Sequence, residues 1–144
     1  MTSSKRIQND RKAQVSLEFL MITAAFLGVL GLWWSVGATV WSEGIWALDV
    51  QEGARFLGEL EFRSSELEVL GNGSWFIVQV HPTHAWALST TDQKIVLEIT
   101  DGARSKRLER VTSMSFQSSV LDLSEILRVR VSREDDSLVV NADH

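Results

Sequence analysis

The sequence predicts an α+β protein, in which a long N-terminal α-helix precedes a small antiparallel, β-sandwich-like domain. Two observations lead to this prediction. Residues 19–42 carry no charge, and at about 1.5 Å per residue this run is long enough as a helix to cross a bilayer core of about 30 Å. After residue 63, short segments in which apolar and polar residues alternate are separated by turn residues, which indicates half-buried strands.

The chain divides into three predicted parts. Residues 1–13 form a basic leader, residues 14–63 form the long helix, and residues 64–144 form an extracellular β-domain. The helix is predicted to be apolar over residues 19–42 and amphipathic beyond them. No proline interrupts residues 14–63, and proline is the residue that most strongly breaks a helix.

The second half of the predicted helix has one apolar face. Trp46, Val50, Ala54 and Leu57 recur at helical spacing among charged residues, which is typical of an amphipathic helix that packs on a folded domain. We therefore expect this stripe to lie against the β-domain.

The charge is distributed unevenly along the chain. Removing residues 1–13 would take away four basic residues and one acidic residue, which changes the net charge from −5 to −8. Basic flanks of membrane helices stay in the cytoplasm, so the domain after the apolar run is expected to face outward. Its acidity argues against a nucleic-acid partner. The chain has no cysteine, so an exported domain would be held by its core, a metal or its neighbours.

Two ordinary roles of the apolar run, a cleaved secretory signal and an uncleaved membrane anchor, can be compared with its length and with the position of Glu18. A conventional secretory signal has an apolar region of about 7–15 residues, which is shorter than this one. A plain uncleaved anchor fits the length and the orientation. It leaves unexplained the polar segment at residues 13–16 and the carboxylate of Glu18 at the border of the run, where a charge is costly.

Residues 13–18, AQVSLE, followed by the uncharged run, resemble the class III signal of archaeal type IV pilin precursors. The resemblance covers roughly residues 5–40. In that family the leader is cut on the cytoplasmic side, and the mature chain has Gln first, Ser third and Glu fifth. These positions correspond to Gln14, Ser16 and Glu18, with Ala13 before the cut, where the family commonly has Gly.

The resemblance implies a non-enzymatic structural subunit, without a cofactor, of an archaeal type IV-like surface filament. The implied partners are a prepilin peptidase, a pilus assembly ATPase and membrane platform protein, membrane lipid before assembly, and copies of itself or other pilins. The subunit would be a single-pass archaeal membrane protein with a cytoplasmic N-terminus, and then part of an extracellular filament with a role in cell adhesion. The alternative is a membrane-anchored accessory or minor pilin-like protein whose outward-facing β-domain does not form a filament.

Cleavage before Gln14 would create an α-amino group that is largely protonated at neutral pH. Glu18 lies four residues further, on the same helical face. The amine and the carboxylate could pair within one chain or between neighbours in a filament core, which would offset part of their desolvation cost or fix the axial register of the subunits. Alternatively, Glu18 simply lies near a helix N-terminus, where negative charge is mildly favoured.

Small and aromatic residues mark two further features of the apolar run. Ala24 and Gly28 form a small-xxx-small pair that would permit close helix contacts, although small residues are also common in membrane helices. Trp41 and Trp46 suit the outer membrane interface, where tryptophan is enriched. Trp33 and Trp34 are expected to pack against lipid or a partner helix.

The β-domain is expected to contain six to eight short strands in a sandwich or barrel. The clearest strands are 74–80, 94–100 and 126–132, the weaker ones are 107–111, 115–121 and 137–142, and 66–70 is either a strand or the helix end. Turn residues occur at 71–73, 91–93, 101–102 and 134–136.

The β-domain sequence contains no motif of a known enzyme class. His81 and His84 are too few ligands for a metal site, so they are assigned to a surface loop. The acidic residues 134–136 lack the spacing of a calcium loop and are assigned to a hairpin tip. The segment Asn72-Gly73-Ser74 is a sequon, which makes Asn72 a candidate N-glycosylation site in a turn.

Overall fold

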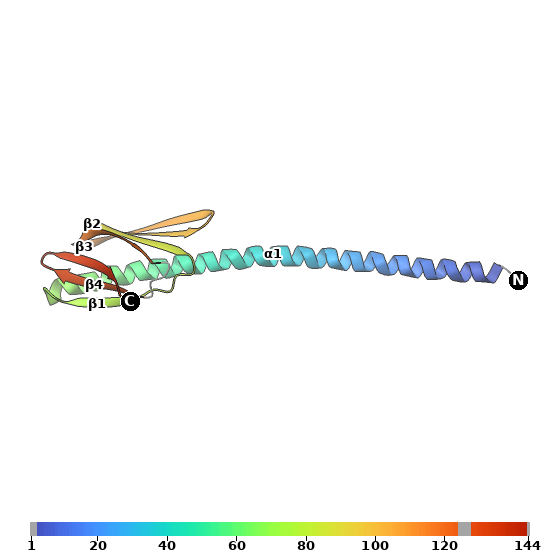
Figure 1. Ribbon diagram of the computed structural model, residues 1–144, viewed down its shortest axis with the longest axis horizontal. Coiled ribbons are helices and arrows are strands. Elements are labelled where there is room, and N and C mark those ends of the chain that lie inside the picture. Colours follow the sequence, from blue (N-terminus) through green and yellow to red (C-terminus); the bar gives the residue numbers. More distant parts are fainter. Residues whose placement is uncertain (1–2, 124–127, 144) are drawn as a thin grey trace. The chain divides into compact units, whose positions relative to one another are not determined.

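The computed structural model describes residues 3–123 and 128–143 (Figure 1), and within these ranges the side chains of residue 14 and of residues 16 onward. The chain forms two compact units, Met1–Glu43 and Gly44–His144. A single helix, α1 (Ser3–Leu70), contributes to both. The predicted long helix is confirmed, but it begins at Ser3, within the predicted leader, and it ends at Leu70, so the ambiguous segment 66–70 belongs to the helix.

Helix α1 ends at a glycine and an arginine cap. Gly71 has a φ of 88°, in the left-handed region that favours glycine, and its N–H donates to the carbonyl oxygen of Leu67 (3.2 Å). Arg133 Nη1 donates to the carbonyl oxygens of Leu67 (3.1 Å) and Glu68 (2.8 Å). Two of the last four carbonyls of the helix, which have no partner within the helix itself, are therefore satisfied by Arg133 of the sheet.

Five strands form one sheet in the order β1-β4-β5-β3-β2. The strands are β1 (Trp75–Gln79), β2 (Ala85–Asp101), β3 (Arg104–Asp122), β4 (Arg128–Glu134) and β5 (Ser137–Ala142). Neighbouring strands are antiparallel except β3 and β5, which pair in parallel. The α+β class is thus confirmed. The sheet itself is mixed and single, whereas the sequence predicted an antiparallel sandwich.

The strand number is lower than predicted because the expected strands 107–111 and 115–121 both belong to the continuous strand β3. Thr91-Asp92-Gln93 was expected to be a turn, but it lies inside β2, where the register with β3 shifts on both sides of Asp92. Asp92 has a φ of 50°, as in a bulge that bends a strand. Ser89 Oγ lies 3.5 Å from the carbonyl oxygen of Val96, so the two halves of β2 fold back toward each other.

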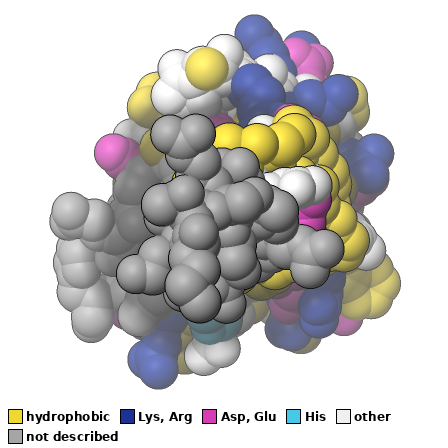
Figure 2. Space-filling view, turned by 90° about the vertical axis from the view of Figure 1, so that its right-hand side faces the viewer, with side chains coloured by type: hydrophobic (Ala, Val, Ile, Leu, Met, Phe, Trp, Pro, Cys, Tyr) yellow, Lys and Arg dark blue, Asp and Glu magenta, His cyan; other side chains and the backbone are white. Residues whose placement is uncertain are grey.

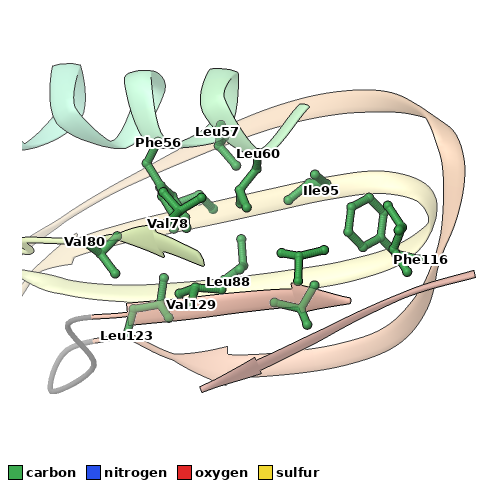
Figure 3. Packing of buried hydrophobic residues seen from close by; sticks show 14 of the residues in the cluster. Phe56, Leu57, Leu60, Val78, Val80, Leu88, Ile95, Phe116, Leu123 and Val129 are labelled. Atoms are coloured by element: carbon green, nitrogen blue, oxygen red, sulfur yellow. The ribbon is translucent and has the colours of Figure 1, made fainter. Parts of the chain in front are cut away.

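Helix α1 covers the concave side of this curved sheet (Figures 1 and 3). Phe56, Leu57 and Leu60 point from the helix into the core, where they join buried residues of all five strands. At the β1 side, Arg63 lies over the Phe76 ring (6.0 Å to its centroid). The helix takes the place of the second sheet of a sandwich, because it buries the same face of the strands.

Gly53 shows how closely the helix approaches the sheet. A Cβ atom at this position would lie 2.6 Å from Ile99 Cδ1 and 3.0 Å from Leu97 Cδ2. Further along the helix, Arg110 Nε of β3 lies 3.6 Å from Glu61 Oε2. The amphipathic half of α1 therefore packs on the β-domain as the sequence predicted.

Candidate functional site

The apolar segment of α1 in the first unit is exposed along its length. Phe19 is 69% exposed and Trp34 is 83% exposed, and the most apolar window of the helix has no buried residue. By length and composition this helix could cross a membrane. A continuous apolar surface of this size marks a site that contacts lipid or protein. The large side chains exposed in this segment are Leu17, Phe19, Leu20, Met21, Ile22, Phe26, Leu27, Val29, Leu30, Leu32, Trp33, Trp34, Val36, Val40 and Trp41.

Hydroxyl groups in this segment bond to the helix itself. Thr23 Oγ1 donates to the carbonyl oxygen of Phe19 (2.8 Å), and Thr39 Oγ1 donates to that of Ser35 (3.1 Å). Ser42 Oγ donates to the carbonyl oxygen of Thr39 (2.9 Å). Polar groups that are satisfied within one helix can enter an apolar environment without losing a partner.

The segment that carries the sequence motif lies on the same helix. Gln14, Ser16 and Glu18 are exposed, and Gln14 Nε2 donates to Glu18 Oε1 (3.4 Å). Ala13 lies in the helix, and its side chain is outside the described residues. The helix thus brings the first and fifth positions of the motif together on one face, as expected for residues four apart.

Three tryptophans surround a small-residue surface at the distal end of this segment. Trp33, Trp34 and Trp41 line a shallow apolar hollow together with Gly37 and Ala38. A Cβ added at Gly37 would meet nothing within 4 Å. The exposed rings agree with the predicted contact with lipid or a partner helix, which remains a prediction.

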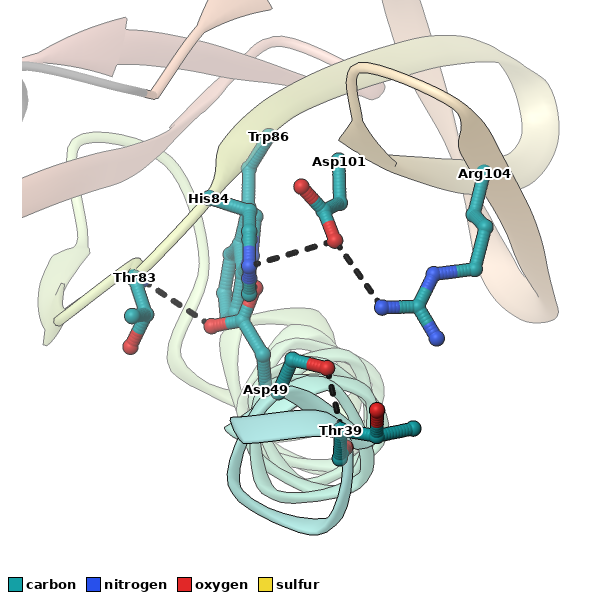
Figure 4. A network of polar contacts seen from close by, with 8 residues as sticks. Thr39, Asp49, Thr83, His84, Trp86, Asp101 and Arg104 are labelled. Atoms are coloured by element: carbon teal, nitrogen blue, oxygen red, sulfur yellow. Dashed lines mark hydrogen bonds and ion pairs between the residues drawn. The ribbon is translucent and has the colours of Figure 1, made fainter. Parts of the chain in front are cut away.

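A buried carboxylate in the second unit was not predicted (Figure 4). Asp49, on helix α1, is 3% exposed and accepts three hydrogen bonds. Its Oδ1 accepts from the backbone N–H of Thr83 (3.0 Å), and its Oδ2 accepts from Trp86 Nε1 (2.9 Å) and His84 Nδ1 (2.9 Å). The loop between β1 and β2 is therefore fixed to the helix by one side chain.

The environment of Asp49 favours its ionised form. Burial alone raises the pKa of Asp49, but the hydrogen bonds from Thr83, Trp86 and His84, together with the charge of His84 when protonated, outweigh it. The pKa of Asp49 is therefore lower than usual. One signal in the sequence could have indicated that Asp49 is buried, although not which residues it contacts: Asp49 is four residues before Gly53, on the helical face that packs on the sheet.

His84 connects Asp49 to a second charged group. Its Nε2 lies 3.8 Å from Asp101 Oδ2, which also accepts a hydrogen bond from Arg104 Nη2 (3.0 Å). The ring packs edge-on against Trp46, with centroids 5.7 Å apart. His84 is thus a partly buried structural residue, whereas the sequence assigned it with His81 to a surface loop. The described residues contain no group of three or more side chains able to hold a metal ion.

Asn72 lies in an exposed turn, as predicted. It lies between Gly71 (φ 88°) and Gly73 (φ 81°), and its Nδ2 donates to Asp135 Oδ1 (3.4 Å). The β4–β5 turn that the sequence also predicted consists of Asp135 and Asp136, and Glu134 is the last residue of β4. Glycosylation of Asn72 remains a prediction.

Comparison of this chain with protein-family models, curated proteins and solved structures yields no match. The functional interpretation therefore depends on the residues and their geometry.

Proposed function

We propose that this protein is a structural subunit of an archaeal type IV-like surface filament. A prepilin peptidase would hydrolyse the peptide bond between Ala13 and Gln14 on the cytoplasmic side of the membrane. The retained helix would anchor the subunit in lipid, and then leave the lipid to pack with the helices of other subunits. An assembly ATPase and a membrane platform protein would drive that transfer, and the β-domain would face the cell exterior.

One observation carries this proposal. Gln14, Ser16 and Glu18 have the family spacing, and they directly precede an exposed apolar helix that the described part of the chain leaves uncovered. A filament core supplies the missing cover, since each helix is surrounded by the apolar faces of its neighbours. Ala24, Gly28 and Gly31 would allow those neighbours to approach closely.

Glu18 has a defined role in this proposal. Cleavage would free the α-amino group of Gln14, one helical turn from the Glu18 carboxylate. In the assembled core the amine of one chain and the carboxylate of the same or a neighbouring chain would pair, because either charge alone would be costly to bury. Such a pair would set the axial position of each subunit more than it would add net stability.

N-terminal mass spectrometry of the membrane-extracted protein and of sheared surface filaments tests the proposal. We expect a mature chain that begins at Gln14, and we expect Glu18→Gln to abolish filaments, because the new amine would lose its partner. Glu68→Gln, which changes an exposed carboxylate of the second unit, is the matched control and should leave filaments unchanged. A mature chain that still begins at Met1, or normal processing and filament growth with Glu18→Gln, would contradict the proposal.

The same experiment distinguishes the accessory role. Unit Gly44–His144 has its own buried core, which favours a domain that can function singly at the membrane surface. A protein that is cut before Gln14 but absent from sheared filaments would be an anchored accessory subunit.

A further inference from the structure

A polar groove lies in the second unit, between helix α1 and the outer side of strand β1. Its volume is about 640 Å³, and both hydrogen-bond donors and acceptors line it. Arg55 and Glu52 contribute from the helix, Gln79 from β1, His81 from the following loop and Arg128 from β4. The groove therefore carries both positively and negatively charged groups, in a protein whose net charge is −5.

Several of these groups are available to a ligand. Within the part of the chain that the structure describes, Arg55, Glu52 and Arg128 form no ion pair or hydrogen bond through their side chains. Arg63, at the same groove, is paired with Glu59 (Nε to Oε1, 2.9 Å). A guanidinium presents several donors in one plane, and a carboxylate presents acceptors, so the groove can bond both oxygen and hydrogen of a hydroxyl group.

An exposed tryptophan lies outside the groove lining, on the same face of β1 as two lining residues. Trp75, Ile77 and Gln79 alternate with the buried residues of the strand and so share its outer face. Trp75 is 53% exposed and lies about 7 Å along the strand from Ile77, at two residues of about 3.4 Å each. Arg130, opposite Ile77 in the register, stacks on the indole ring (4.7 Å to the centroid). That stacking fixes the orientation of the ring.

We propose that this groove binds a saccharide chain, with Trp75 as the stacking platform. The face of an indole ring is electron-rich, and it attracts the C–H face of a sugar ring, whose hydrogens carry partial positive charge. Arg128, Gln79 and Glu52 would then bond the hydroxyl groups of the adjoining sugar units. The proposal goes beyond filament formation, because it concerns the outer surface of the β-domain and requires no assembly.

The same observations disfavour a nucleic acid as the ligand. The acidic chain as a whole would repel a polyanion, and Glu52 adds an unpaired carboxylate within the groove. Single-stranded nucleic acids are bound by successive aromatic platforms, whereas Trp75 is the only aromatic residue on the outer faces of β1, β4 and β5 within the described residues. Hydroxyl groups suit a mixed set of guanidinium, amide and carboxylate groups.

The test uses the full chain, solubilised in a zwitterionic detergent without a sugar headgroup. The probes are immobilised neutral and uronate-containing oligosaccharides, followed by titration of each one that binds. We expect Trp75→Ala and Arg128→Gln each to weaken binding at least tenfold, and Trp75→Phe to weaken it less. Phe62→Ala, which removes an exposed ring of α1 outside the groove, should leave binding unchanged. Unchanged thermal midpoints would show that the variants fold.

Two results would overturn the proposal. One is that no oligosaccharide binds, whether or not Trp75→Ala and Arg128→Gln then weaken binding of single-stranded oligothymidylate or abolish self-association measured by light scattering. The other is that oligosaccharide binding occurs but is unaffected by both variants. Because the unassembled chain is measured, none of these results depends on processing at Gln14 or on filament growth.

Discussion

The two units of this protein place similar side chains in opposite environments. In the first unit, leucine, phenylalanine and tryptophan side chains of residues 17–41 are exposed. In the second unit, Phe56, Leu57 and Leu60, on the same helix α1, are buried against the sheet. The second unit satisfies the hydrophobic effect within the chain, whereas the first unit requires lipid or other helices to do so. We therefore expect the stability of the first unit to depend on its surroundings.

The largest expected effect comes from charging the exposed segment. Leu27→Arg combined with Leu30→Arg should release the protein from membranes, because each arginine costs about 3 kcal/mol at the centre of a membrane helix. The fraction that resists extraction by alkaline carbonate measures this change. Phe62→Arg combined with Val69→Arg changes two side chains of the second unit that are also exposed, and should have no effect. Full retention of the first variant in the membrane would show that residues 19–42 do not anchor the chain.

A core truncation tests the other side of the comparison. Leu97→Ala should destabilise the second unit by about 2–5 kcal/mol, since a fully buried leucine leaves a cavity when it is shortened. Leu32→Ala removes the same atoms from an exposed position of the first unit and should leave urea unfolding of the second unit unchanged. Equal effects of the two changes would contradict the division into an exposed segment and a buried core.

Asp49→Asn tests the polar connection between the loop and helix α1. At about pH 7 we expect this change to lower the free energy of unfolding by about 2 kcal/mol, because a neutral amide replaces the charged acceptor of the hydrogen bonds. The pKa of Asp49 is lowered in the folded state, so its ionised form stabilises the fold above the unfolded pKa of about 3.9. That contribution disappears as the pH falls through the folded pKa. The difference in free energy of unfolding between wild type and Asp49→Asn, measured with urea, should therefore shrink below about pH 4.

The control for this pH dependence is Asp136→Asn, at the exposed β4–β5 turn. It should leave the stability nearly unchanged at every pH. A difference between wild type and Asp49→Asn that stayed constant down to low pH would indicate a steric effect in place of the lost charge.

The smallest expected effects distinguish two glycines of the same helix. Gly53→Ala should destabilise the second unit by about 1–2 kcal/mol, because the new methyl group overlaps the buried Ile99 side chain. Gly58→Ala meets no atom within 4 Å and should stabilise the helix by up to about 1 kcal/mol. Thermal or urea unfolding of the two variants measures these changes. Stabilisation by both alanines would mean that α1 packs less closely on the sheet than described.

Local patterns predicted the main elements correctly. The absence of proline and the apolar periodicity predicted the long helix, and the alternation in 137–142 matches strand β5 (Ser137–Ala142). The turn residues at 71–73, 101–102 and 134–136 separate elements as expected. One exception is Asp92, where the sequence indicates a change of direction but does not distinguish a turn between strands from a bulge within one.

Part of the candidate site was also predictable. The spacing of Gln14 and Glu18 places them on one helical face, and the structure contains a hydrogen bond between their side chains. The Asp49 contacts with Thr83, His84 and Trp86 could not be predicted, because they join residues more than 30 positions apart. Sequence periodicity reports neighbours within one element and carries no information on which loop meets which helix.

The amino-acid sequence by itself determined the two kinds of apolar surface in this protein. A long uncharged run requires an apolar environment, and the apolar stripe of an amphipathic helix requires a surface to pack on. Both requirements follow from local composition and helical geometry. Only the tertiary structure decided that the sheet is single and mixed, that the helix closes it, and that Asp49 is buried as an anion. Those outcomes depend on pairings between distant segments, whose free energies no local pattern contains.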